Sequence, residues 1–473
     1  MAAPRLPPHV EDSPCFAALR NSCTRQLSEE FTFSGFAMYT LTPTAERRLL
    51  WLLALTQFTI IMDFMVMMPL GPQLIAALHI TPAAFATAVS TYSWCSGLSG
   101  LLAATYIDRF DRKRLMLMVY FFFALSNLAC AMASNYPMLL AARAFAGITG
   151  GVLGSVVLAI LADLIPVERR GAATGTLMTA FALAAVAGVP AGVLIGAHLG
   201  WGAPFLLLVV LSALVWLGVR AVVPSLNEHL KTAPPPLSQV LPALWALLSK
   251  PAHFESFALT FVMMVSHMMV IPFISPVLVA NYGIAPDHLG WMYMAGGAAS
   301  FFTSRAVGRL ADRWGKHRTF RLFAVLSFLP VLFITHMPAL PFLAVVAFFP
   351  FFLVLVSSRM IPMQALLSTV PAPAQRGAFL SANSAVQSFG TGCGAWFGGV
   401  LLGNTATGQI TGYGTVGWIA VALVACCIPW IGRIGSNGGQ LRESHGAVGV
   451  TADRAPGVAP TSATATAGGT LRS

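Results

Sequence analysis

The chain has 473 residues, of which 57% are hydrophobic and only 9% are charged, and its mean hydropathy is +0.76. A water-soluble domain would carry nearer a quarter of charged residues, so this composition excludes a soluble protein and indicates one that crosses a membrane many times. The formal net charge of +11 does not indicate a nucleic-acid partner, because the basic residues are not gathered in one soluble segment.

The chain opens with a segment, residues 1–47, that we expect to be a cytoplasmic tail. It contains prolines and acidic pairs but no apolar run long enough for a signal peptide, and Met38 offers an alternative start. Stretches of about 20 apolar residues then predict transmembrane helices. The twelve predicted helices span 49–73, 84–107, 115–133, 137–162, 172–197, 203–223, 254–280, 288–310, 319–336, 340–368, 378–402 and 414–434.

These helices divide into two bundles of six, at 48–223 and 254–434. Residues 224–253 are the longest polar stretch inside the chain and are predicted to be a cytoplasmic loop between the bundles. Residues 435–473 are mostly Gly, Ala, Thr and Ser, so we expect a disordered cytoplasmic tail there. The sequence therefore predicts an all-α polytopic membrane protein.

The distribution of basic residues predicts the orientation in the membrane. Loops on one side contain no Lys or Arg, whereas the loops on the other side carry many; the loops without basic residues lie around 74–83, 134–136, 198–202, 281–287, 337–339 and 403–413. By the positive-inside rule, both termini are cytoplasmic and the protein lies in the cell membrane. The basic loops then have anionic lipid headgroups as partners. We expect a monomer.

Two charged strings predict tight hairpins between helices, because they are too charged to enter lipid. They begin at Asp108 and Asp312, which are 204 positions apart, and they occupy the same place in the two halves. Such internal duplication is typical of transporters. The candidate gating residues in these hairpins are Asp108, Arg109, Arg112, Asp312, Arg313 and Lys316.

The second string, Gly308 followed by residues 311–318, resembles the signature loop of the major facilitator superfamily, G-x-L-A-D-R-x-G-R/K-x-R. The first string departs from it, with Ala104 and Asp111 where glycines are usual. The resemblance extends over 48–434 and implies two six-helix bundles, with hairpins that hold the inner face closed. Alternatively, the hairpins only orient the helices. Their basic residues are expected to meet lipid phosphate.

A glycine-rich stretch in the fifth predicted helix contains Gly188, Pro190, Gly192 and Gly196. Small residues at this spacing let helices approach closely. The stretch resembles the antiporter motif of the drug and metabolite efflux branches, and in particular of sugar and nucleoside exporters, although Gly202 stands where Arg is often found. The resemblance implies export, whereas close packing without directional meaning is the alternative.

Asp63 is the sharpest single candidate. It lies 15 positions beyond Arg48, or about 22 Å into the first helix at 1.5 Å per residue, where a carboxylate costs about 2.5–3.5 kcal/mol to insert. Thr56 and Thr59 share its face, so this polar stripe must look into the bundle. We expect Asp63 to carry a proton or to bind a substrate cation. Permanent pairing with a buried arginine is the alternative.

Arg143 lies deep in the fourth predicted helix and needs a partner, and Asp63 is the only acid that is clearly buried. In the superfamily it resembles, such an arginine assists proton transfer. Hydrogen bonds to backbone carbonyls would explain Arg143 equally well. The sequence therefore assigns proton coupling to Asp63 and Arg143.

Further polar side chains in the apolar helices are candidates for binding the substrate. They are Thr59, His267, Arg359, Asn383 and Gln387. Arg359 could bind an anionic substrate group or the inner gate, or it could pack locally near Ser357, Ser358 and Gln364. His267 could equally be a core residue.

The sequence contains no phosphate-binding loop, no nucleophile motif and no metal-ligand spacing, and its seven cysteines are scattered. We therefore expect neither an enzyme nor a cofactor. The prediction is a secondary transporter that exports a small organic molecule in exchange for protons by alternating access. Uptake by proton symport is the alternative within this class. A membrane-embedded enzyme or sensor is the alternative outside it.

Overall fold

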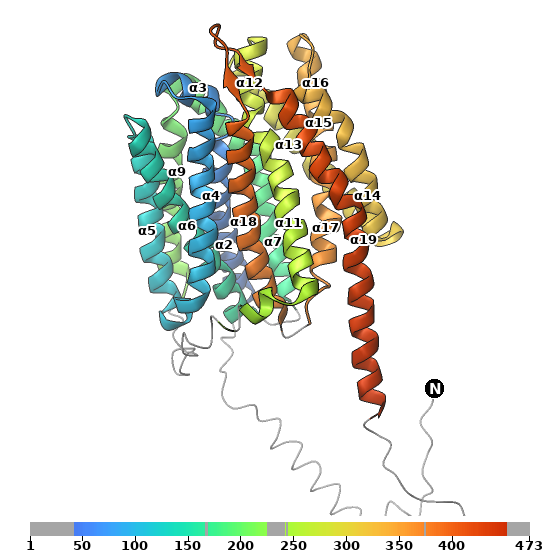
Figure 1. Cartoon of the computed structure of the whole chain (residues 1–473). Helices are drawn as coiled ribbons and strands as arrows, with labels where there is room; N and C mark the ends of the chain where they lie inside the picture. The colour runs from blue at the N-terminus through green and yellow to red at the C-terminus, as the bar shows by residue number, and fades with distance from the viewer. Residues whose placement is uncertain (1–41, 166–168, 225–241, 243–244, 373–374, 452–473) are drawn as a thin grey trace, which may run out of the picture.

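The structure, a computed structural model, describes residues 42–165, 169–224, 242, 245–372 and 375–451. It is a bundle of long helices in two halves, residues 42–224 and 245–451, which we call the N-terminal and C-terminal halves (Figure 1). The N-terminal half contains α2 (Pro43–Val66), α3 (Gly71–Ala77), α4 (Pro82–Tyr106), η1 (Ile107–Arg109), α5 (Arg112–Ala131), α6 (Tyr136–Leu164), α7 (Arg170–Leu183), the π-helix η2 (Ala184–Gly188), α8 (Val189–Leu199) and α9 (Ala203–Val222).

The C-terminal half repeats this order. It contains α11 (Pro251–Val270), η4 (Ile271–Phe273), α12 (Ile274–Tyr282), α13 (His288–Trp314), α14 (Lys316–Leu326), α15 (Phe328–Thr335), α16 (Phe342–Ser358), α17 (Met360–Leu367), α18 (Arg376–Val400) and α19 (Tyr413–Thr451). A short hairpin of β1 (Gly403–Asn404) and β2 (Ile410–Thr411), which the sequence analysis missed, precedes α19.

Each of the twelve predicted spans corresponds to one helix or to a consecutive run of helices. Among the described residues, nine helical spans are long and apolar enough to cross a membrane, and the bent pair of α3 and α4 makes a tenth. The other two, α13 and α18, are richer in charged, glycine and serine residues. The predicted all-α, multi-pass membrane fold in two bundles is therefore confirmed.

Some predicted boundaries were wrong. The first helix begins at Pro43, not at residue 49, because Thr42 caps it by accepting a hydrogen bond from the Ala45 amide. The second predicted hairpin is mostly helical: α13 continues to Trp314, and Gly315, with φ of 89°, makes the turn. The helix α19 continues to Thr451 into the expected disordered tail, because extending a formed helix avoids the cost of nucleation.

Prolines break three of the C-terminal spans in their middle. Pro272 lies inside its break, and Pro330 and Pro362 each lie three residues beyond theirs, because proline cannot donate to the carbonyl four residues earlier. These breaks fall at η4, at Ser327 between α14 and α15, and at Arg359 between α16 and α17.

The two halves meet along α4 and α18, and α8 with η2 packs against α13. We call the side of the hairpins at 108–114 and 312–318 the basic end, and the side of α3 and α12 the opposite end (Figure 1). The halves fit closely near the opposite end, where Phe85 and Phe273 meet edge to face and Gly71 lies against Pro276. Towards the basic end, a groove of about 360 Å³ separates α2 and α7 from Phe301 and Arg305 of α13.

Candidate functional site

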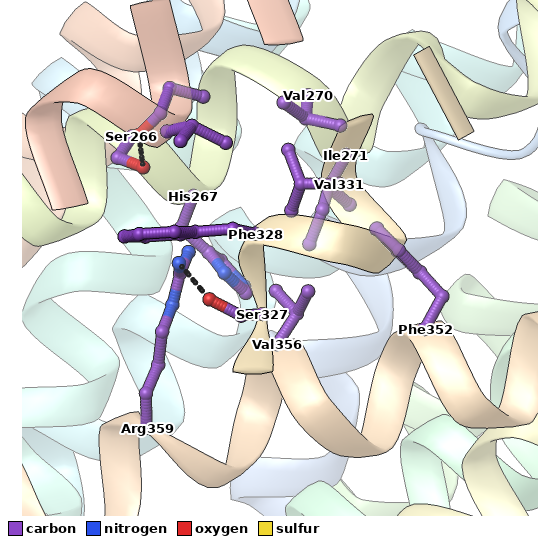
Figure 2. Close-up of a pocket in the computed structure, with 12 residues that line it drawn as sticks. Ser266, His267, Val270, Ile271, Ser327, Phe328, Val331, Phe352, Val356 and Arg359 are labelled. Carbon is purple, nitrogen blue, oxygen red and sulfur yellow. Dashed lines mark hydrogen bonds between the residues drawn. The ribbon is translucent and has the colours of Figure 1, made fainter. Parts of the chain in front are cut away.

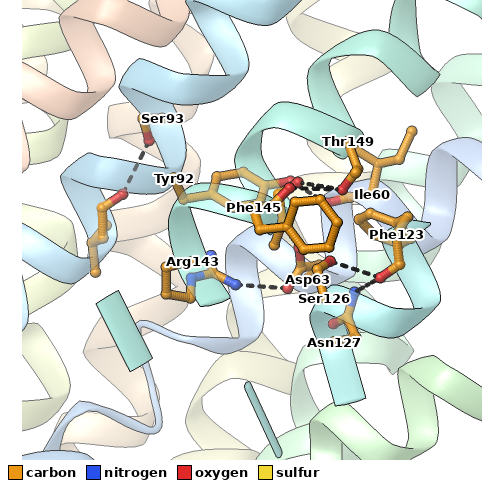
Figure 3. A network of polar contacts seen from close by, with 12 residues as sticks. Ile60, Asp63, Tyr92, Ser93, Phe123, Ser126, Asn127, Arg143, Phe145 and Thr149 are labelled. Atoms are coloured by element: carbon orange, nitrogen blue, oxygen red, sulfur yellow. Dashed lines mark hydrogen bonds and ion pairs between the residues drawn. The ribbon is translucent and has the colours of Figure 1, made fainter. Parts of the chain in front are cut away.

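A buried ion pair joins the first and fourth spans of the N-terminal half. Arg143 Nη1 of α6 lies 2.7 Å from Asp63 Oδ1 of α2, and both side chains are 0% exposed (Figure 3). The prediction that these two residues are partners is confirmed. Asp63 Oδ2 and the Nε and Nη2 atoms of Arg143 have no hydrogen-bond partner in the described structure, so the pair is joined by a single bond.

The pairing makes the two charges a neutral unit inside an apolar bundle. Removing one partner of such a pair costs about 3–5 kcal/mol, because the other charge then stays buried without compensation. Protonation of Asp63 would likewise leave the Arg143 charge buried without compensation. A proton on this carboxylate therefore changes the stability of this conformation of the bundle. This is the chemistry that a proton-coupling site needs.

The ring of Tyr92 covers the ion pair. The guanidinium carbon of Arg143 lies 4.3 Å from the centre of this ring, and Phe64 stacks on Tyr92 at 5.8 Å between ring centres. Tyr92 is 3% exposed and its hydroxyl reaches the Ile60 carbonyl at only 3.5 Å. Tyr92 therefore meets the ion pair in two ways: its ring faces Arg143, and its hydroxyl interacts with the Asp63 carboxylate.

A central pocket of about 270 Å³ lies between the halves, and Tyr92 forms part of its wall. Its lining is Ile60, Ile61, Phe64, Tyr92, Ser93, Ser96, Phe181, Ser384, Gln387, Ser388 and Thr391. The lining comes from α2, α4, α7 and α18 and contains hydroxyl, amide and aromatic groups but no charged side chain. The volume is near the lower end of the range for small-molecule sites, roughly 300–1,000 Å³.

Of the five predicted substrate-binding residues, Gln387 lines this pocket. Asn383, one turn away on α18, is buried and accepts a hydrogen bond from the Thr260 hydroxyl at 2.9 Å. Thr59 is also buried, and its hydroxyl lies 2.6 Å from that of Tyr120 on α5. The polar stripe of Asp63 thus looks into the bundle, as predicted, but Thr59 faces the interior of its own half.

The remaining two predicted substrate-binding residues, His267 and Arg359, lie together in the C-terminal half (Figure 2). They line a cavity of about 10 Å³, away from the central pocket. Arg359 Nη1 donates to the Ser327 hydroxyl at 3.1 Å, so its partner is not among the residues near 357–364 that the sequence suggested.

The sequence analysis missed the pocket residues Tyr92, Ser93 and Ser96 of α4. It also missed Ser388 and Thr391, which continue a stripe from Ser384 and Gln387 at intervals of three and four along α18. This spacing puts the side chains on one face of a helix and is the signal that could have identified them.

The first hairpin holds a network around Arg112. This side chain is buried and donates to Asp108 at 2.6 Å, to Asp163 at 3.0 Å and to the Ile107 carbonyl at 2.6 Å. The expectation that its basic residues meet lipid phosphate is therefore wrong for Arg112, because two carboxylates and a carbonyl occupy its donors. Arg109 is exposed.

The second hairpin is less connected. Asp312 and Arg313 are exposed in the last turn of α13, and Lys316 Nζ donates to the Ala365 carbonyl at 2.9 Å. Both sets of contacts stay within their own half. Among the described residues, these hydrogen bonds and ion pairs of the hairpin residues do not join the two halves.

The glycine stretch of η2 and α8 packs against α2, the helix that carries Asp63. A Cβ atom on Gly188, Gly192 or Gly196 would meet Met62, Val66 or Leu70 at 2.5–2.6 Å. Pro190, inside the first turn of α8, follows the π-helical turn 184–188. The small residues therefore permit close packing of α2, and their directional role stays a prediction.

The sequence matches the family described as the Major Facilitator Superfamily over residues 53–255 and again over 256–448. It is 27% identical over 191 residues to a "Probable sugar efflux transporter" of Mannheimia succiniciproducens, covering 40% of this chain and 46% of that protein. It is also 27% identical over 276 residues to a "Chloramphenicol resistance protein" of Streptomyces lividans, covering 58% of this chain and 68% of that protein.

Among solved structures, the chain resembles that of a D-xylose-proton symporter with a TM-score of 0.66. The alignment covers 81% of this chain and 97% of that chain at 15% sequence identity. At this level of identity, the similarity concerns the fold.

Proposed function

The chain belongs to the major facilitator superfamily and is a secondary transporter, not an enzyme, and we propose that it exports a small organic molecule in exchange for protons. The observation that carries the proposal is the Asp63–Arg143 pair, which the Tyr92 ring separates from the central pocket. The substrate would thus lie on the pocket side of Tyr92, and the proton would bind on its other side, at Asp63.

In this mechanism, the charged Asp63 holds Arg143 at 2.7 Å and keeps α2 and α6 together. A proton on Asp63 neutralises the carboxylate and leaves the Arg143 guanidinium facing the rings of Tyr92 and Phe205, 4.3 and 6.0 Å from their centres. Tyr92 and the α2 residues Ile60, Ile61 and Phe64 also form the pocket wall, so a shift of the pair changes the shape of the pocket. Protonation and substrate binding would then favour different conformations.

The pocket lining favours an uncharged substrate with hydrogen-bonding groups. Its polar atoms are hydroxyls and one side-chain amide, together with the aromatic faces of Phe64, Tyr92 and Phe181. The similarity to two relatives named a probable sugar efflux transporter and a chloramphenicol resistance protein supports export of a small organic molecule. Proton-symport uptake is the second candidate, because the ion pair serves either direction.

We further propose that the basic end faces the cytoplasm, that both termini lie there, and that the protein acts as a monomer in the cell membrane. The asymmetry of Lys and Arg between the two ends supports this orientation. In the described conformation the opposite end is tightly packed, and the two hairpins would close the basic end when the halves rock about the pocket.

The test uses proteoliposomes and a substrate selected from neutral sugars and neutral drugs by thermal shift and counterflow. Asp63→Asn should abolish accumulation driven by a pH gradient while counterflow continues. The control is Asp287→Asn, the same chemical change at the N-cap of α13, where Asn caps equally well. An Asp63→Asn protein that concentrates substrate as well as wild type would remove Asp63 from coupling.

Direction is measured in everted vesicles by a trapped pH dye and labelled substrate together. An antiporter moves the two in opposite directions, so acidifying the lumen should drive substrate in while protons leave. Movement of both in the same direction would replace export by symport.

A further inference from the structure

Arg359 is a buried cation without a counter-charge. It is 2% exposed and occupies the one-residue break between α16 and α17. Its Nη1 atom donates to the Ser327 hydroxyl, and its Nε atom has no partner. Within the described part of the chain, no Asp or Glu lies within salt-bridge distance of it. Buried charges are normally paired, because desolvation costs several kcal/mol per ion.

A second unpartnered group faces the same space. His267 Nδ1 is buried and has no hydrogen-bond partner, and its ring lines the small cavity beside Arg359. Figure 2 shows the guanidinium, the imidazole and the Ser327 hydroxyl pointing toward one another, close to Phe328. Two nitrogen atoms that can both donate, with nothing to accept from them, indicate a missing acceptor.

Comparison with the N-terminal half identifies what is missing. Asp63 and His267 are 204 positions apart, the same interval that separates Asp108 from Asp312, and α2 and α11 end at Val66 and Val270 with that interval too. His267 therefore takes the place in its half that the carboxylate takes in the other. An arginine lies beside this position in the C-terminal half too, but it is Arg359, 216 rather than 204 positions after Arg143, and no described carboxylate pairs with it.

We propose that Arg359, His267 and Ser327 form a binding site for a small anion, which supplies the absent negative charge. Size limits the occupant, because a cavity of about 10 Å³ is close to the minimum for one water molecule, roughly 10–15 Å³. A halide ion such as chloride fits with small side-chain shifts, and so does the tip of a carboxylate group, but not a whole organic substrate.

The surrounding backbone suits such a site. The breaks at η4, at Ser327 and at Arg359 bring three interrupted helices together here, and interrupted membrane helices mark ion and substrate sites in transporters. The anion site is separate from the central pocket, so it depends neither on the direction of transport nor on proton coupling.

The experiment measures the melting temperature of the detergent-purified full chain in sodium gluconate, with chloride, bromide or acetate added at constant ionic strength. Chloride and bromide should raise the wild-type melting temperature by about 2 °C when they saturate the site. Arg359→Gln should lose this shift. Arg309→Gln, which removes the same charge from an exposed position on α13, should keep it.

The added anions separate the two sources of the charge. A shift with acetate and none with halides would assign the site to a carboxylate group. Equal shifts in wild type and Arg359→Gln would overturn the proposal. If Arg359→Gln does not fold, crystals of the wild-type protein grown in bromide decide: an anomalous peak in contact with Arg359 supports the halide site, and its absence overturns that site.

Discussion

The two halves share one fold but treat their buried arginines differently. In the N-terminal half, Arg143 is neutralised by Asp63 at 2.7 Å, whereas among the described residues of the C-terminal half Arg359 donates to the Ser327 hydroxyl and has no carboxylate partner. Duplication has therefore kept the backbone and changed the electrostatics. Because each buried charge in a membrane is costly, an unequal distribution of charges indicates unequal tasks. The neutral pair suits a proton, and the lone cation suits an anion.

The hairpins repeat this contrast at the basic end. Arg112 holds Asp108 and Asp163, while Lys316, at the equivalent position 204 residues later, holds only the Ala365 carbonyl. The first hairpin is thus held by more polar contacts than the second. A gate that uses both hairpins would have one rigid side and one weakly held side.

The largest effect is expected at the neutral pair. Arg143→Gln leaves Asp63 buried and unpaired, so it should lower the free energy of unfolding by about 3–5 kcal/mol. The double variant Asp63→Asn/Arg143→Gln should recover most of this loss, because it leaves no uncompensated charge. Melting temperatures of the three proteins in detergent measure both effects. A double variant as unstable as the single one would mean that Arg143 stabilises the fold by packing.

A smaller loss is expected when the ring over the pair is removed. Tyr92→Leu takes away the face that Arg143 meets at 4.3 Å, and a desolvated contact of this kind contributes about 2 kcal/mol. Tyr92→Phe keeps the ring and loses only the weak hydroxyl contacts with the Ile60 carbonyl and Asp63, so it should cost about 1 kcal/mol, less than Tyr92→Leu. Thermal melting compares the two variants. Equal losses would assign the role of Tyr92 to its hydroxyl.

Much of this architecture could be predicted from the sequence. Superfamily membership is confirmed, and ten of the twelve predicted spans are long and apolar enough to follow from hydropathy, since a helix that crosses lipid must be long and apolar. The pairing of Arg143 with Asp63 followed by elimination, because few charges lie so deep in apolar helices. These features depend on local composition and on the cost of burying a charge.

Other features depend on tertiary packing and could not be predicted. Thr59 meets Tyr120 across 61 positions, and no local pattern says which helix faces which. Pro330 and Pro362 were visible in the sequence, but proline within a membrane helix allows a kink or a complete break, and the neighbouring helices decide. For the same reason the encounter of His267 with Arg359 appeared only in the structure.

The contrast between the hairpins predicts a modest difference. Arg112→Gln removes three donated bonds, but its carboxylate partners are partly exposed, so the expected loss is about 1–2 kcal/mol. Lys316→Gln should cost less than about 1 kcal/mol. Thermal melting gives the two losses. As a readout of gating, Arg112→Gln should also speed the labelling of a cysteine placed at Ser384 in the central pocket, and unchanged labelling would limit this network to stability.

A small effect on stability is expected at Arg359, even though it is nearly as deeply buried as Arg143. Arg359→Gln in chloride-free buffer removes a charge that has no described partner, so no opposite charge is left behind. Replacing a buried ion by a neutral side chain is then neutral or even stabilising, and the change should stay within about 1 kcal/mol of wild type. The measurement is the melting temperature in gluconate, run beside Arg143→Gln. Equal and large losses in both variants would break the comparison, because Arg359 would then have to be compensated within the protein itself.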